Sequence, residues 1–208
     1  MGKVIFGKWG TTPGNRNPQA KDAGGREKVY QLRISLPESD PEIWRRFLVS
    51  GNTTLAKLHK VIQAVMGWTD SHLHEFAVRD ITFGDPDPEM KAEGMRNEKK
   101  AFLYQVAPGV RASFMYVYDF GDDWIHRITV EKITDNHEKF SGKPVCLEGE
   151  RACPPEDCGG IPGYYDLLEI IKDPEDPEYE EIMDWLGGCF DPEYIDIKKI
   201  NSALQKIR

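Results

Sequence analysis

The clearest β-hairpin signal in the chain lies in residues 113–131, Ser113-Phe-Met-Tyr-Val-Tyr-Asp-Phe-Gly-Asp-Asp-Trp-Ile-His-Arg-Ile-Thr-Val-Glu131. Its first eight residues are rich in aromatic and β-branched side chains, which favour strands. Gly121 is followed by two aspartates, and these residue types form tight turns. From Trp124 onward apolar and polar side chains alternate, as in a strand with one buried face. We therefore predict two antiparallel strands joined by a turn at residues 121–123.

Three further strands are predicted upstream of this hairpin. Residues 30–36 alternate apolar and polar side chains, as a half-buried strand does. Residues 43–49 form a second strand after a proline-rich turn, so these two runs should pair. Residues 73–79 make a third strand. Together with the central hairpin, these segments predict a mixed or antiparallel sheet of about five strands, with polar loops at residues 84–100 and 134–160.

One amphipathic helix is predicted between the strands, over residues 54–66. Thr53 and Thr54 are residue types that cap the start of a helix, and Gly67 is of the type that ends one. Apolar residues recur at intervals of three and four, which gives the helix one face for packing against the sheet: Leu55, Leu58, Ile62, Val65 and Met66.

The C-terminal part of the chain, residues 161–208, changes to helical patterns. Residues 164–171 form a short apolar segment, Asp176 opens a helix that ends before Gly187, and Asp196 caps a last helix. Strands followed by helices are typical of the α+β class. The order of hairpin, helix and further strands is also that of a β-grasp domain, so we expect a related topology.

The composition limits the classes of protein to consider. The chain has 208 residues, of which 39% are hydrophobic and 30% charged, and its formal net charge is −8. We expect a single domain over residues 28–208, after a flexible arm at residues 1–27. The negative charge argues against direct nucleic-acid binding, which needs a basic surface. The sequence has no run of about 18 apolar residues and no apolar signal segment, so we expect a cytoplasmic protein without a membrane partner.

The cysteines form the most unusual motif. Cys146, Cys153 and Cys158 are separated by six and four residues, in a segment rich in proline and glycine. Zinc binds thiolates and imidazoles in a tetrahedral set, so these cysteines are candidate zinc ligands, with His126 or Cys189 as the fourth. The other interpretation is that they are small buried hydrophobic residues in a packed connection. A redox or catalytic thiol is less expected, because the chain has no Cys-x-x-Cys pair.

Histidines and acids supply a second group of candidate site residues. His72 and His74 are two residues apart, which on a strand places both rings on one face for metal binding or proton transfer; local hydrogen bonding at a strand start explains them equally. Acids beside a histidine near the hairpin turn can hold a metal or act in acid–base chemistry, although aspartates also favour turns. The candidates there are Tyr118, Asp119, Asp122, Asp123, Trp124 and His126.

Glu156 and Asp157 lie between two of the cysteines. They are of the type that caps the helix expected to begin near Pro162. As catalytic acids they would need a partner that the sequence does not place, so both remain candidate site residues.

Several of these motifs together resemble the plasmid pRiA4b ORF-3-like family, over roughly Tyr30 to Leu204. The segments that carry the resemblance are His72-Leu-His-Glu-Phe76, Tyr118-Asp-Phe-Gly-Asp-Asp-Trp-Ile-His126, Cys153-Pro-Pro-Glu-Asp-Cys-Gly-Gly160, Gly163-Tyr164 and Phe190-Asp-Pro-Glu-Tyr-Ile-Asp196. The family is also labelled as the passenger protein TnpR of an insertion element. The resemblance implies an association with plasmids and mobile DNA, and no defined biochemical activity.

Three functions are therefore open. The first is a binding or accessory protein with a structural metal, which we expect to be zinc, at the cysteine loop. The second is a metal-assisted, hydrolase-like enzyme in which His72, His74, Asp122 and His126 converge on one cleft. The third, a DNA-binding recombination protein, is the least expected, because no serine within a basic cluster is apparent and the net charge is negative.

Overall fold

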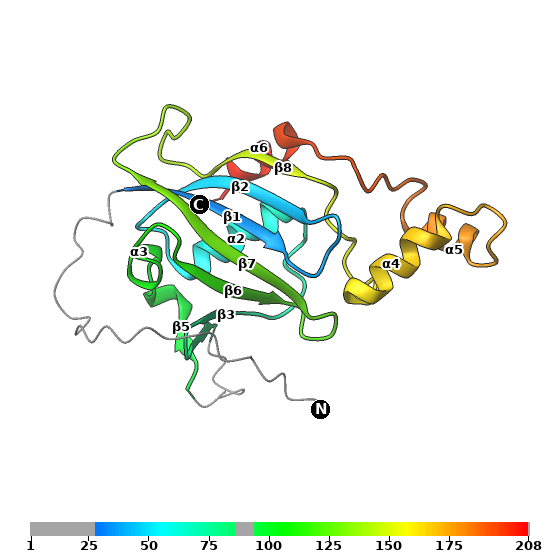
Figure 1. The fold of residues 1–208 in the computed structure, drawn as a ribbon, viewed down its shortest axis with the longest axis horizontal. Helices are drawn as coiled ribbons and strands as arrows, with labels where there is room; N and C mark the ends of the chain where they lie inside the picture. The colour runs from blue at the N-terminus through cyan, green and yellow to red at the C-terminus, as the bar shows by residue number, and fades with distance from the viewer. Residues whose placement is uncertain (1–27, 86–93, 208) are drawn as a thin grey trace.

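A computed structural model describes residues 28–85 and 94–207, so the predicted arm at residues 1–27 lies outside the described part of the chain. Its main feature is one sheet of eight strands in the order β5-β4-β3-β6-β7-β1-β2-β8 (Figure 1). The strands are β1 (Val29–Leu36), β2 (Ile43–Ser50), β3 (His74–Val78), β4 (Ile81–Gly84), β5 (Arg96–Asn97), β6 (Ser113–Tyr118), β7 (Trp124–Thr134) and β8 (Val145–Glu150).

Five helices accompany the sheet in the described residues, which confirms the predicted α+β class. They are α2 (Leu55–Met66), α3 (Leu103–Val106), α4 (Gly160–Ile170), α5 (Tyr179–Trp185) and α6 (Ile197–Leu204), with a 3-10 turn η1 (Glu98–Lys100). In the described residues, no helix is long and apolar enough to cross a bilayer.

The predicted central hairpin is present. Strands β6 and β7 pair antiparallel, from Ser113 opposite Thr129 to Tyr118 opposite Trp124. The turn between them contains two left-handed residues, Asp119 with φ of 58° and Asp123 with φ of 54°. Aspartate tolerates this conformation because its side chain can hydrogen-bond to the nearby backbone.

The prediction of about five strands was too low. Strand β4 follows β3 after a turn of two residues, and β5 is only two residues long. Strand β8 lies inside the predicted 134–160 loop. Its two glutamates and its glycine are residue types that are uncommon in strands, so the sequence did not indicate it. It forms the edge of the sheet by pairing with β2. The predicted surface loop at residues 84–100 is also wrong in part, because Glu98 is only 3% exposed.

The sheet differs from the expected β-grasp topology. A β-grasp sheet sets its first strand parallel to a late strand beside it, whereas β1 lies antiparallel to both of its neighbours, β2 and β7. The only parallel pair in the described sheet is β4 with β5.

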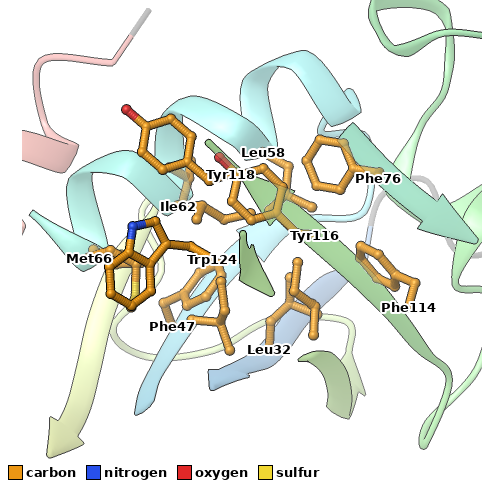
Figure 2. Packing of buried hydrophobic residues seen from close by; sticks show 14 of the residues in the cluster. Leu32, Phe47, Leu58, Ile62, Met66, Phe76, Phe114, Tyr116, Tyr118 and Trp124 are labelled. Atoms are coloured by element: carbon orange, nitrogen blue, oxygen red, sulfur yellow. The ribbon is translucent and has the colours of Figure 1, made fainter. Parts of the chain in front are cut away.

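Helix α2 covers the inner face of the sheet, as predicted. The Thr54 side chain accepts a hydrogen bond from Lys57 N at 3.2 Å, and Gly67 ends the helix with φ of 100°. Every residue of the predicted apolar face is buried. Figure 2 shows Leu58 and Ile62 of the helix packed with side chains from the strands, including Leu32, Phe47 and Tyr116.

The C-terminal helices divide into two groups. Helix α6 contacts β8 and α2, and the Asp196 side chain caps it by accepting from Lys199 N at 2.9 Å, as predicted. Helices α4 and α5 extend to one side, beyond the turn of the central hairpin (Figure 1). The residue that precedes helix α5 is Glu178, two residues after the predicted cap Asp176, so the helix begins at Tyr179. The loop between β8 and α4 therefore runs past the hairpin turn.

Candidate functional site

The candidate site lies at the turn of the β6–β7 hairpin, where three segments distant in sequence meet. They are the residues before β3, the hairpin turn, and the loop between β8 and α4. Asp119 N donates to Leu73 O at 2.9 Å, which joins the first two segments. Gly159 N donates to Asp122 Oδ2 at 3.1 Å, which joins the last two. The fold thus brings together motifs that the sequence presents separately.

The centre of this site is His72, which lies between two carboxylates. Its Nε2 is 3.1 Å from Asp157 Oδ1, and its Nδ1 is 3.4 Å from Asp119 Oδ2. Although these atoms are close, Nε2 is shielded from solvent and has no hydrogen-bond partner among the described residues. The carboxylate of Asp157 therefore stands near the ring nitrogen without the alignment of a hydrogen bond.

Asp119 has two roles in this geometry. Its Oδ1 accepts from Gly121 N at 2.9 Å, which is the turn-forming role that aspartate often takes. Its Oδ2 faces His72. Because the residue is only 8% exposed and its backbone is fixed by the turn, the carboxylate is held in place. Asp119 therefore forms the turn through one carboxylate oxygen, while its other oxygen faces His72 at the candidate site.

Tyr118 and Glu156 form a second contact between the hairpin and the loop. The Tyr118 hydroxyl donates to Glu156 Oε1 at 2.5 Å and accepts from Ser71 N at 3.0 Å. Burial, together with the hydrogen bond to Glu156, raises the pKa of Tyr118 above its ordinary value. The second oxygen of Glu156 accepts from Thr69 N and Thr69 Oγ1. These bonds give Glu156 a positioning role: it holds the loop beside the site.

His74 does not join His72 at this site. The first strand residue is His74, so His72 precedes β3 and the expected alternation along a strand does not apply to the pair. His74 Nε2 lies 2.9 Å from Glu98 Oε2, and its ring stacks on that of His59 with centroids 3.4 Å apart. The two predicted neighbours thus serve different clusters.

The second cluster is one that sequence reasoning missed. His59 Nε2 lies 2.6 Å from Asp70 Oδ1 and its Nδ1 lies 2.8 Å from the Tyr116 hydroxyl, which also accepts from Gln63. Burial, followed by the charge of His74, lowers the pKa of His59. The sequence did contain one signal for this cluster: His59 and Gln63 are four residues apart, so both side chains lie on the same side of the helix, beside its apolar face.

Trp124 and His126 lie in the core and not at the site surface. Both are 0% exposed. His126 Nδ1 is 3.3 Å from Tyr116 O, while Nε2 has no hydrogen-bond partner among the described residues. Burial lowers the pKa of His126 to about 4, so its ring is neutral at pH 7. Trp68 packs edge-on against this ring and donates from Nε1 to Pro154 O at 3.0 Å.

The cysteines are placed in different elements. Cys146 lies in β8 and pairs with Phe47, whereas Cys153 and Cys158 lie in the loop and pack against the core. Cys189 is exposed, and all four are free thiols. Burial raises the pKa of Cys146 to about 11 and that of Cys158 to about 12, which disfavours a reactive thiolate.

One group of described residues has the geometry for a metal ion. Within residues 28–85 and 94–207, His72, Asp119 and Asp157 form the only set of three or more histidine, cysteine or acidic side chains with ligand atoms within 4.8 Å of one another. The predicted set of Cys146, Cys153, Cys158 and His126 is not gathered in this way. One imidazole and two carboxylates are ligands that suit zinc, manganese or iron.

The fold and the site define an α+β protein whose mostly antiparallel sheet carries a cluster of one imidazole and two carboxylates at a hairpin turn. Residues 28–199 match the plasmid pRiA4b ORF-3-like protein family, and the chain belongs to that family. It is 37% identical over 180 residues to an uncharacterized protein, y4hQ, of Sinorhizobium fredii strain NGR234, covering 86% of this chain and 92% of the relative.

A solved structure has the same fold. The crystal structure of MM3350, a protein of unknown function from Methanosarcina mazei Go1, is 43% identical in sequence and superposes with a TM-score of 0.73. The match covers 82% of this chain and 96% of that one. These relatives establish the family and the fold, and the chemistry must be argued from the site itself.

Proposed function

We propose that this protein is a binding or accessory protein that holds a divalent metal ion between His72, Asp119 and Asp157. The observation that carries the proposal is the His72 ring. Its Nε2 is buried and makes no hydrogen bond to the described residues, although a carboxylate oxygen lies 3.1 Å away. Ligand atoms of one metal ion are separated by about this distance, because each lies about 2.1 Å from the ion.

The environment of the cluster also supports a cation. The loop and the hairpin turn are rich in acids, and no lysine or arginine among the described residues forms an ion pair with Asp119 or Asp157. A metal ion would neutralise the two carboxylates and would hold the loop against the hairpin. Three protein ligands leave coordination positions open for a ligand from solution.

The metal proposal is tested by titration of the purified, chelator-treated protein with Mn²⁺ and Zn²⁺ in a calorimeter. We expect His72→Ala and Asp157→Asn each to weaken binding by at least about 10–100-fold, because even the loss of a residue that only orients a metal ligand has an effect of this size. His137→Ala is the matched control, since His137 lies in the loop after β7 and should leave affinity unchanged. Equal affinity of all four proteins would contradict the proposal.

A structural zinc at the cysteine loop stays a separate prediction. It is tested by metal analysis of the protein as purified, in comparison with the variant Cys153→Ser/Cys158→Ser. If the cysteines hold zinc, His72→Ala carries about one zinc per chain, and adding the two cysteine substitutions to His72→Ala removes it. A metal-free wild type that is fully folded would instead leave the cysteines as packing residues.

A metal-assisted, hydrolase-like activity is the second candidate. It is favoured by the open coordination positions of the proposed site, because a bound metal ion lowers the pKa of water and makes a nucleophile at neutral pH. His74 and His126, which the sequence suggested for this role, are separated from the cluster, so the reaction would depend on His72 and its two carboxylates. A role in insertion-element biology stays a prediction based on the family label.

A further inference from the structure

A cleft of about 380 Å³ lies between α4, α5 and the loop after β8. Its apolar side chains come from both helices, with Leu167 and Ile170 on α4 and Ile182 and Trp185 on α5. Within each helix the two residues are three positions apart and therefore lie on one face. The cleft is thus an apolar groove between two helices, which project beyond the hairpin turn (Figure 1).

The groove is only partly covered by the protein itself. Helix α5 has no buried residue, and Trp185 is 49% exposed. An amphipathic helix normally buries its apolar face against neighbouring elements. A large exposed aromatic side chain at the wall of an apolar groove is typical of a surface that binds another molecule.

The rim of the groove is acidic. Asp157, Asp166 and Glu181 line it, and neither Asp166 nor Glu181 forms an ion pair with the described basic residues. Around them, residues 156–196 contain fourteen acids and one basic residue, Lys172, a formal charge of −13. Because the whole chain has a charge of −8, the other residues together carry +5. The charge of the protein is therefore concentrated on this part of the surface.

We propose that the groove binds a basic amphipathic helix of a partner protein. Apolar side chains of that helix would fill the space between Leu167 and Trp185, and lysines or arginines flanking them would face the acidic rim. An amphipathic helix in an apolar groove is a common mode of peptide recognition, and complementary charge selects the partner and speeds its association. The proposal does not depend on a metal at His72, although Asp157 borders both sites.

The test is a calorimetric titration of the full chain with an 18-residue helical peptide that carries leucines on one face and lysines elsewhere. The informative variant is Asp166→Lys/Glu181→Lys, with one rim acid changed on each helix. Its matched control is Glu169→Lys/Glu180→Lys, which changes the charge equally on the same two helices outside the groove. We expect the rim variant to weaken binding by about tenfold or more, and the control by less than about threefold.

Three outcomes would overturn the proposal. A peptide of the same composition in scrambled order that binds equally well would mean that charge alone attracts it. Absence of binding to the wild type would mean that the groove is not a peptide site. A dimer in sedimentation velocity that the rim variant dissociates would assign the groove to a second copy of this chain. Binding that survives His72→Ala is expected, and this separates the groove from the metal proposal.

Discussion

Acidification from pH 7 to pH 4 should lower the free energy of unfolding by about 3 kcal/mol through His126 alone. The ring is fully buried, and its pKa in the folded protein is about 4, compared with the ordinary 6.5. The cause is desolvation, because a charged imidazolium in the core loses its water shell.

The sign follows from which state binds the proton more tightly. The folded-state pKa is depressed, so the unfolded chain takes up a proton first as the pH falls. The stabilising contribution of the neutral ring is therefore complete above pH 6.5 and is lost progressively between pH 6.5 and about 4. His59, whose pKa is also lowered by burial, should add to the loss in the same direction.

The measurement is urea denaturation at pH 7 and at pH 4, in the presence of a chelator, for the wild type and His126→Gln. The variant will be less stable at pH 7, but its loss of stability between the two pH values should be smaller by about 3 kcal/mol. His137→Gln, in the loop after β7, should behave like the wild type. If His126→Gln showed the same pH dependence as the wild type, His126 would not be a buried neutral group.

The parts of the fold that could be predicted from the sequence are those that local patterns determine. The central hairpin has strongly β-prone strands around a turn of aspartates and glycine, and α2 has both of its caps and its apolar face in the sequence. Strand β8 has no such pattern. It is a strand because β2 offers it an edge to pair with, and Phe47 of that edge pairs with Cys146, far away in the sequence.

The candidate site also depends on contacts between segments distant in sequence, which local patterns do not predict. His72, Asp119 and Asp157 could each be selected as a polar residue in an unusual motif, but their proximity could not be deduced. It depends on how the loop after β8 passes the hairpin turn, and on the Tyr118–Glu156 hydrogen bond that holds it there. Sequence spacing also suggested that His72 and His74 act together, whereas the start of β3 separates them.

Gly160, at the end of the loop between β8 and α4, packs closely against the backbone of Asp122 in the hairpin turn. We therefore expect Gly160→Ala to be strongly destabilising. A Cβ atom at Gly160 would lie 2.3 Å from the backbone oxygen of Asp122, closer than any real Cβ contact. The residue also has φ of +68°, a conformation that side chains disfavour. We expect a loss of roughly 2–4 kcal/mol in the free energy of unfolding, the sum of backbone strain and overpacking.

Gly187→Ala separates these two causes. Gly187 has φ of +76°, but a Cβ atom there would have no neighbour within 4 Å. Its substitution should therefore cost only the strain of the left-handed backbone, roughly 1–2 kcal/mol. The difference between the two variants in chemical denaturation measures the contact with Asp122. If Gly160→Ala cost no more than Gly187→Ala, the loop would have room to move and the contact would not position it.

The same pair of variants links the loop to the proposed metal site. Asp157 lies three residues before Gly160, so a displaced Gly160 should carry the Asp157 carboxylate away from His72. Gly160→Ala should then weaken Mn²⁺ or Zn²⁺ binding by about tenfold or more under conditions where the protein is fully folded, because a small displacement of a ligand is costly in a metal site. Gly187→Ala should bind as the wild type does. Retention of full metal affinity in Gly160→Ala would show that Asp157 reaches His72 without the close packing of the loop against the hairpin turn.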